Sequence, residues 1–291
     1  MRRVRAAPTL LTLANLICGF GSISMAIRST AGGLRPDQLE TFQSYAVWFI
    51  GLAMIFDLLD GHVARMTGLT SRFGAELDSL ADIVSFGVAP AVLGRVILGA
   101  GELDLNVQRG GWVMLALYVA AAAVRLARYN VEAISAENGS VSAKGKDYFT
   151  GLPSPAAAGM AVSPVLLYHW LIEQGANEPA TRKALAVGLP VLMLGLAWLM
   201  ISRVRYLHLG NWLSGRRQKL VPVMLVICLL SLAAAYRHQV PLLAVSVYVL
   251  GCLAWDLARR LANARARRKL LGTGGPGGAP GGGSPLGPAR P

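Results

Sequence analysis

The sequence predicts an all-α, polytopic membrane helix bundle, and three observations support this prediction. Of the 291 residues, 54% are hydrophobic and only 15% are charged, with a mean hydropathy of +0.49. A water-soluble domain of this length carries more charge than that on its surface. The hydrophobic residues gather in eight segments that are long enough, or nearly so, to cross a hydrocarbon core of roughly 30 Å. The lysines and arginines lie beside these segments, with a bias toward one side.

The eight predicted spans follow one another from the N-terminus through short connections. Three arginines precede the first span, which continues to about Ile27 without the small-residue cleavage pattern of a signal peptide, so we expect a retained helix. The last two spans are short and are separated only by Arg237 and His238, so they are expected to form a hairpin. In order, the spans are 9–27, 42–61, 77–98, 110–129, 154–172, 184–202, 220–236 and 239–256.

The basic residues predict how the spans are oriented. With the N-terminus in the cytoplasm, 20 of the 28 lysines and arginines fall on the cytoplasmic side and 7 on the other side, while Arg290 lies in the tail. This bias favours eight spans with both termini in the cytoplasm. The net charge of +13 therefore indicates membrane orientation and attraction to anionic headgroups rather than nucleic-acid binding.

Composition also predicts a domain organisation. The C-terminal Gly/Pro-rich stretch cannot bury enough apolar surface to offset its backbone entropy, so we expect it to be disordered. The basic segment before it is expected to lie along the membrane surface. The predicted parts are a basic N-terminus (1–8), a transmembrane core (9–205), a transmembrane hairpin (206–256), a basic cytoplasmic segment (257–271) and the disordered tail (272–291).

Four of the 15 acidic residues fall within 26 positions of the second and third predicted spans. Asp57 and Asp60 share one helix face, because a helix advances about 100° per residue. Asp78 and Asp82 are one turn apart on the next helix. The polar stretch 66–73 between the two helices contains a glycine and predicts a turn. We therefore expect the four carboxylates to meet near the cytoplasmic end of the membrane.

Such a cluster predicts a metal site. Carboxylates inside apolar segments are costly and mark functional sites. Four of them close together repel one another and, unless protonated, need cationic partners. An all-oxygen set of ligands favours Mg²⁺, Mn²⁺ or Ca²⁺, and no histidine and cysteine set competes. A single aspartate at a helix end is usually a cap or an interfacial charge, but four at helical spacing exceed that explanation.

The residues among the aspartates suit a phosphate-rich ligand. Arg65 supplies a positive charge beside the acidic residues. Gly61, Ala64 and Gly74 are small, so they let a ligand or a neighbouring helix approach closely.

Residues 57–82 follow the pattern D-x2-D-G-x2-A-R-x8-G-x3-D-x3-D. This pattern resembles the signature of the CDP-alcohol phosphotransferase family, with every defining position present. The resemblance implies a six-helix transmembrane core, usually homodimeric. It also implies transfer of a phosphatidyl or similar group from a CDP-linked donor to an alcohol with release of CMP, assisted by one or two divalent ions, Mg²⁺ or Mn²⁺.

The resemblance also implies roles for individual residues. Asp57, Asp60 and Asp78 are expected to be metal ligands, and Asp82 a metal-binding or metal-adjacent general base. The expected CDP-binding residues are Asp57, Asp60, Gly61, Ala64, Arg65, Gly74 and Asp78. An alcohol hydroxyl is a weak nucleophile and needs such a base within hydrogen-bond reach. We expect direct attack by the alcohol, and a route through a phosphorylated enzyme stays open.

A longer resemblance bears on the acceptor alcohol. Much of 8–165 resembles bacterial family members that use L-serine, in PTLLTLANLICGFGSISMA, ELDSLADIVSFGVAPA, VRLARYN and YFTGLPSPAAAG. It implies that CDP-diacylglycerol and serine give phosphatidylserine and CMP. Arg125 and Arg128, and more weakly Lys144 and Lys146, are candidates to bind a lipid phosphate or the serine carboxylate. Membrane orientation alone is the alternative explanation for the two arginines.

Other functions stay open. The acceptor could be glycerol 3-phosphate, an inositol phosphate or a related alcohol, and the donor an archaeal-type lipid. A cation transporter would distribute its charges along a path through opposed repeats, which the clustered acids do not favour. The expected partners are CDP-diacylglycerol, L-serine, membrane lipids and a second copy of the chain, with no nucleic acid. The expected location is the inner (cytoplasmic) membrane, with the active site at its cytoplasmic face.

Overall fold

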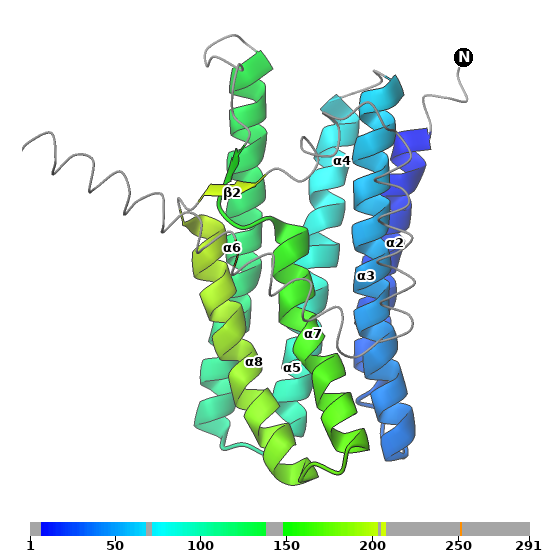
Figure 1. Cartoon of the computed structure of the whole chain (residues 1–291), viewed down its shortest axis with the longest axis vertical. Helices are drawn as coiled ribbons and strands as arrows, with labels where there is room; N and C mark the ends of the chain where they lie inside the picture. Colours follow the sequence, from blue (N-terminus) through cyan, green and yellow to red (C-terminus); the bar gives the residue numbers. More distant parts are fainter. Residues whose placement is uncertain (1–6, 68–71, 138–147, 203–204, 208–250, 252–291) are drawn as a thin grey trace, which may run out of the picture. The chain divides into compact units, whose positions relative to one another are not determined.

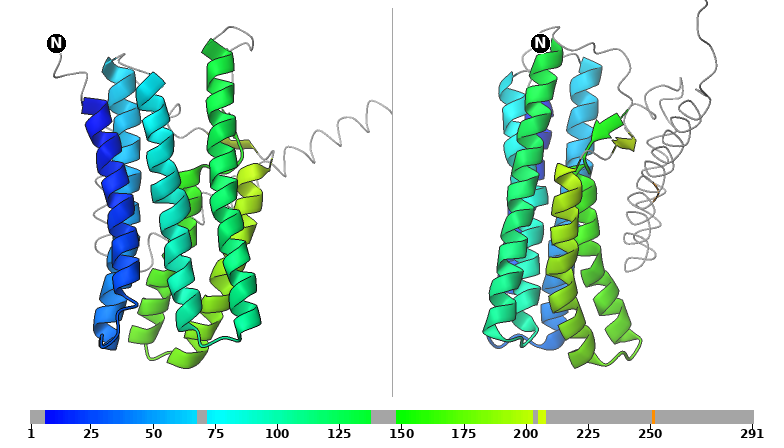
Figure 2. Two further views of the ribbon diagram at one scale, coloured as in Figure 1. Left: turned by 180° about the vertical axis from the view of Figure 1, so that it is seen from behind. Right: turned by 90° about the vertical axis from the view of Figure 1, so that its left-hand side faces the viewer.

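The computed structural model describes residues 7–67, 72–137, 148–202, 205–207 and 251. All of these residues belong to one unit, Met1–Leu253, while the second unit, Ala254–Pro291, lies outside the described residues. In the described part, six helices are long and apolar enough to cross a membrane, and they run side by side in a bundle (Figures 1 and 2). The prediction of an all-α polytopic membrane bundle is confirmed.

The first six predicted spans are found at the expected positions, and each is longer than predicted. The predicted span 42–61 lies within Pro36–Val63, and 77–98 lies within Phe73–Ala100. Hydropathy marks only the apolar part of a helix, whereas helix propensity and capping set where the helix ends. The predicted spans 220–236 and 239–256, apart from residue 251, lie outside the described residues, as do the basic segment and the Gly/Pro tail.

The bounds of the elements, in chain order, are α2 (Ala7–Arg28), α3 (Pro36–Thr67), α4 (Arg72–Asp82), η1 (Ile83–Val88), α5 (Ala89–Ala100), α6 (Leu105–Glu137), β1 (Tyr148–Thr150), α7 (Ser154–Glu173), α8 (Glu178–Ile201) and β2 (Arg205–Leu207). The elements α4, η1 and α5 together form the third span. Helix α2 packs along α3, and α6 packs along α8. The two short strands pair in antiparallel fashion and were not predicted from the sequence.

The third span contains a π-helical segment, η1, immediately after α4. Within it, the backbone N–H of Ala89 donates to the carbonyl of Val84, five residues earlier. Pro90 has no N–H, so in an α-helical pattern the carbonyl of Phe86 would lack its donor. The buried hydroxyl of Tyr118 on α6 donates to that carbonyl at 2.9 Å. Single π-turns inside α-helices often occur at functional sites, and this one follows the last motif aspartate directly.

A tight turn just before α7 packs against the end of α8. Gly151 has a φ of +87°, a conformation that side chains disfavour, and a Cβ atom there would collide with the carbonyl oxygen of Met200. The backbone N–H of Leu152 donates to the carbonyl of Leu199 at 3.2 Å. This turn follows β1 directly and therefore helps to place the strand pair beside the end of α8 (Figure 1).

Candidate active site

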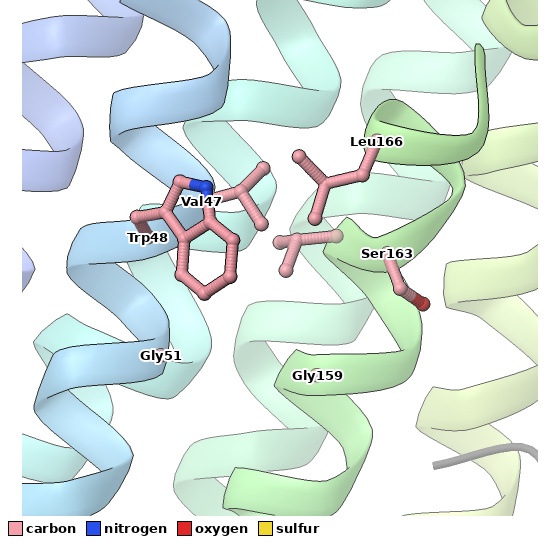
Figure 3. Close-up of a pocket in the computed structure, with 7 residues that line it drawn as sticks. Val47, Trp48, Gly51, Gly159, Ser163 and Leu166 are labelled. Carbon is pink, nitrogen blue, oxygen red and sulfur yellow. The ribbon is translucent and has the colours of Figure 1, made fainter. Parts of the chain in front are cut away.

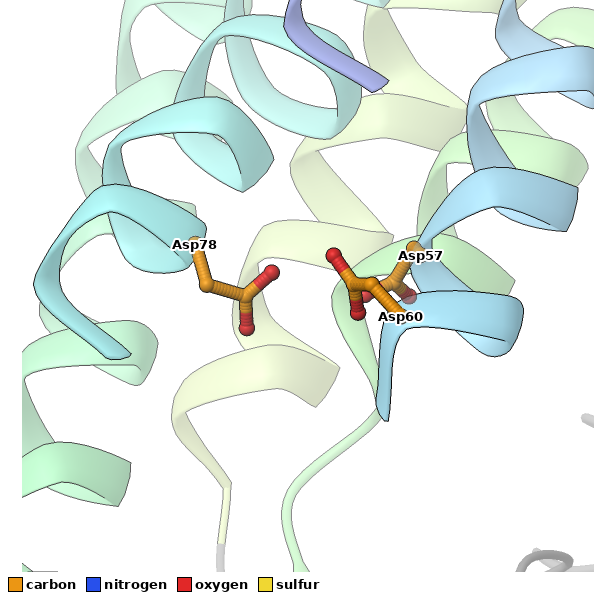
Figure 4. Close-up of side chains that lie close together, drawn as sticks. All are labelled: Asp57, Asp60 and Asp78. Atoms are coloured by element: carbon orange, nitrogen blue, oxygen red, sulfur yellow. The ribbon is translucent and has the colours of Figure 1, made fainter. Parts of the chain in front are cut away.

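Three motif aspartates meet between the C-terminal part of α3 and the middle of α4. Asp57 and Asp60 project from α3, and Asp78 faces them from α4 (Figure 4). One carboxylate oxygen from each lies within 4.8 Å of the other two. Asp60 is buried, whereas Asp57 and Asp78 are half-buried. The sequence prediction that two consecutive helices bring these carboxylates together is confirmed for these three residues.

The geometry of this trio fits a divalent cation. Its carboxylates repel one another electrostatically, and burial strengthens that repulsion. Oδ1 of Asp78 is buried and has no hydrogen-bond partner among the described residues. Buried polar atoms are normally paired, so this oxygen is a ready ligand atom for an ion. Carboxylate oxygens are the ligands that hard divalent ions prefer. The trio can therefore hold a divalent metal ion.

Asp82 lies at the last position of α4, one turn beyond Asp78, and is 8% exposed. It does not belong to the set of three whose oxygens lie within 4.8 Å. Its carboxylate nevertheless interacts electrostatically with those of Asp57, Asp78 and Asp60. Its Oδ1 accepts a hydrogen bond from Nδ2 of Asn15 at 3.1 Å. Asp82 is thus held next to the trio by a neutral partner.

Two polar residues of α2 donate hydrogen bonds to the acidic cluster, and neither was predicted from the sequence. The hydroxyl of Thr12 donates to Oδ2 of Asp60 at 2.9 Å, and Asn15 bonds to Asp82 as described above. Thr12 is 4% exposed and Asn15 is fully buried. A signal was present, because the two residues lie three positions apart in a mostly apolar span and so share a helix face. Both side chains are neutral, and in a membrane segment it is charged side chains that mark a functional site by default.

The small and basic motif residues lie on the same two helices as the trio. Gly61 lies directly after Asp60 on α3, and Gly74 lies one turn before Asp78 on α4; both are half-buried. Ala64 and Arg65 lie near the end of α3, but their side chains are outside the described part of the structure. Their predicted contacts with a CDP moiety stay predictions.

The two candidate arginines of α6 contact the protein itself. Arg125 donates from Nη1 to the hydroxyl of Ser154 at 2.8 Å, at the start of α7. Arg128 donates from Nη1 to the carbonyl of Ile201 at 3.1 Å, at the end of α8. Both therefore help to fix α7 and α8 against α6. Their predicted contact with a phosphate or carboxylate is untested, and the other two candidates, Lys144 and Lys146, lie outside the described residues.

A separate apolar groove lies between α3 and α7 (Figure 3). It has a volume of about 70 Å³ and contains no titratable side chain, so it offers no catalytic chemistry. Its lining residues are Val47, Trp48, Gly51, Gly159, Val162, Ser163 and Leu166. The acidic cluster, not this groove, is the candidate active site.

Comparison with known proteins shows which family the chain resembles. The family model described as CDP-alcohol phosphatidyltransferase matches residues 5–203. The matched region contains all four motif aspartates, the contacts from α2 and both arginines of α6. It extends through the six spans that the structure describes.

Relatives from bacteria, a yeast and an archaeon carry the name CDP-diacylglycerol–serine O-phosphatidyltransferase. The protein of Helicobacter pylori J99 is 42% identical over 164 residues, which cover 55% of this chain and 60% of the relative. That of Saccharomyces cerevisiae is 39% identical over 152 residues, 52% and 50% of the two chains. That of Methanocaldococcus jannaschii is 43% identical over 113 residues, 39% and 46% of the two chains. The chain thus spans at most about 60% of the length of these curated relatives.

Proposed function

The chain belongs to the CDP-alcohol phosphatidyltransferase family, and from this we propose that it transfers the phosphatidyl group of CDP-diacylglycerol to the hydroxyl of L-serine, releasing CMP. The observation that carries the proposal is the trio of Asp57, Asp60 and Asp78, whose oxygens gather within 4.8 Å at the family motif. The names of the relatives support serine as the acceptor.

We assign Asp57, Asp60 and Asp78 to the binding of Mg²⁺ or Mn²⁺. The number of ions, one or two, stays open. When bound, such a cation neutralises the pyrophosphate of the donor and stabilises the departing CMP. Gly61 and Gly74 are half-buried beside the trio, and small residues there would let the nucleotide approach the helices closely. Arg65 and Ala64 are proposed to contact the nucleotide with them.

Asp82 is proposed as the general base. The serine hydroxyl oxygen attacks the phosphorus that carries the diacylglycerol, and its proton passes to the Asp82 carboxylate. A new oxygen–phosphorus bond forms while the bond between that phosphorus and the CMP oxygen breaks. The pair of electrons from the broken bond leaves with CMP. The hydrogen bond from Asn15 leaves Asp82 a second carboxylate oxygen for this proton.

The membrane setting follows from the six spans. We place the chain in the cytoplasmic membrane with the acidic end of the bundle on the cytoplasmic side, because the positive-inside bias of the basic residues favours that orientation. CDP-linked donors and free serine would reach the site from that side. A homodimer is the proposed assembly, on the strength of the family resemblance.

A panel of acceptors tests the proposed function. Purified protein is incubated with CDP-diacylglycerol, Mn²⁺ and one alcohol at a time: L-serine, glycerol 3-phosphate or inositol phosphate. We expect CMP release and lipid product with serine only. Product with another alcohol and none with serine would overturn the serine assignment. An archaeal-type lipid donor, which the sequence leaves open, is a useful second substrate in the same panel.

The variant Asp82→Asn tests the assigned base. We expect turnover with serine to disappear while binding of the donor is at least partly retained, because the amide keeps the size of the carboxylate but cannot accept the proton. Near-normal turnover of this variant would remove Asp82 from the base role.

A further inference from the structure

Helix α2 contacts two of the acidic residues with two neutral side chains. Thr12 donates to Asp60 at 2.9 Å, and Asn15 donates to Asp82 at 3.1 Å. These carboxylates come from different helices, α3 and α4, and α2 lies against both. Helix α2 thus connects one member of the proposed metal site with the proposed base.

Both contacts are built with buried groups. Thr12, Asn15, Asp60 and Asp82 are each at most 8% exposed, so water does not compete strongly for their hydrogen bonds. A hydrogen bond to a charged group is stronger than one between two neutral groups. Neutral donors fix the direction of a carboxylate without neutralising its charge, which leaves the charge for a cation or a proton.

The backbone of α2 is itself held against the π-helical segment that follows Asp82. The hydroxyl of Ser85 donates to the backbone carbonyl of Asn15 at 3.0 Å. One turn farther along α2, Gly19 lies against the same serine with no room for a side chain. The backbone that carries Asn15 is therefore held against the segment that directly follows Asp82.

We propose that Thr12 and Asn15 are positioning residues with separate tasks: Thr12 orients the Asp60 carboxylate for the cation, and Asn15 orients the Asp82 carboxylate for the acceptor hydroxyl. This inference rests on the proposed function. The alternative is that both residues are ordinary buried polar groups that hold α2 in the bundle. That alternative predicts no division of tasks, in which one residue affects Mn²⁺ affinity and the other affects turnover alone.

The two tasks are separated by two measurements on purified full-length protein. The first is the affinity for Mn²⁺ alone, followed by the electron paramagnetic resonance signal of the free ion. The second is steady-state kinetics of CMP release with serine at saturating Mn²⁺. We expect Thr12→Val to weaken Mn²⁺ binding about tenfold or more, as loss of groups that orient metal ligands commonly does. Thr12→Ser retains the hydroxyl and should restore the affinity.

Asn15→Leu should give the opposite pattern. Its Mn²⁺ affinity should stay within about twofold of wild type, while kcat falls about 10- to 100-fold and the KM for CDP-diacylglycerol changes little, because a misplaced base slows chemistry rather than binding. Asn15→Ala is made alongside as a smaller substitution. An effect that the leucine variant shows and the alanine variant does not is caused by the size of leucine, not by loss of the hydrogen bond.

Ser22→Ala is the matched control. Ser22 is buried on α2, and its hydroxyl has no hydrogen-bond partner among the described residues, so its removal should leave both measurements unchanged. Equal loss of Mn²⁺ affinity in the Thr12 and Asn15 variants, or no loss in either measurement, would overturn the inference. Absence of Mn²⁺ binding or of CMP release in the wild type would instead contradict the proposed function.

Discussion

Gly19 of α2 lies so close to Ser85 of η1 that a Cβ atom on Gly19 would be 2.9 Å from the Cα atom of Ser85. No larger residue fits there unless the two helices move apart. The same serine donates a hydrogen bond to the backbone carbonyl of Asn15, whose side chain bonds to Asp82. Close helix packing at a glycine therefore sets the distance between α2 and the proposed base.

The first prediction concerns this packing. Gly19→Ala should separate α2 from η1, weaken the bond between Asn15 and Asp82 and lower kcat about tenfold or more. Steady-state CMP release measures the effect. Gly195→Ala on α8 is the control, because a Cβ atom there meets nothing within 4 Å; it should keep full activity and stabilise its helix by roughly 0.5–1 kcal/mol. Equal activity of the two variants would contradict this view of the packing.

The second prediction concerns the acidic trio. Asp78→Asn removes a negative charge from the site, so we expect Mn²⁺ affinity to fall about 10- to 100-fold and turnover to fall with it. Titration of Mn²⁺ against the purified variant measures the affinity. Asp37→Asn is a matched control at the start of α3, where Asp37 is exposed and pairs with Arg35 at 3.2 Å. Its loss should change neither quantity; a comparable loss of affinity there would mean that general charge, not the trio, attracts the ion.

The third prediction concerns the π-helical segment. Tyr118→Phe removes the hydroxyl that donates to the carbonyl of Phe86, which leaves a buried acceptor short of a donor. We expect a loss of about 1–3 kcal/mol of stability, seen as a lower Tm in detergent. Tyr45→Phe is the control, since Tyr45 is 52% exposed on the surface of α3. An unchanged Tm for the Tyr118 variant would show that the π-turn does not depend on this bond.

The fourth prediction compares two glycines with similar backbone angles. Gly151 has a φ of +87° and faces the carbonyl of Met200, whereas Gly175 has a φ of +83° and open space around its Cα. Gly175→Ala should cost about 1–2 kcal/mol from the left-handed conformation alone. Gly151→Ala should cost more, because the methyl group also displaces the end of α8. Thermal unfolding ranks the two variants, and an equal Tm for both would argue against the clash.

Much of the fold was predictable because hydropathy and helical spacing act locally. The six described spans and the meeting of Asp57, Asp60 and Asp78 follow from the lengths of the apolar runs and from the few residues that separate α3 from α4 in the sequence. The ends of the spans were less predictable: α3 begins at Pro36, six residues before the apolar run, because a proline is tolerated at the start of a helix.

The long-range contacts could not be predicted in the same way. Nothing near Asp82 in the sequence indicates that Asn15, 67 positions earlier, donates to it. A hydroxyl from another helix donates to a carbonyl within the π-helical segment, and the strand pair joins segments more than 50 positions apart. Such features arise from packing between helices, which the periodicity of a single helix does not report.

The most direct test of the central claim is transfer by protein from which divalent ions have been removed. Purified wild type is treated with a chelator, and CMP and phosphatidylserine are quantified together before and after Mn²⁺ or Mg²⁺ is returned. We predict that neither product forms once the ions are removed. When Mn²⁺ or Mg²⁺ is returned, CMP and phosphatidylserine should form again, in amounts equal to each other. Full transfer by rigorously metal-free protein would contradict a shared cation held by Asp57, Asp60 and Asp78.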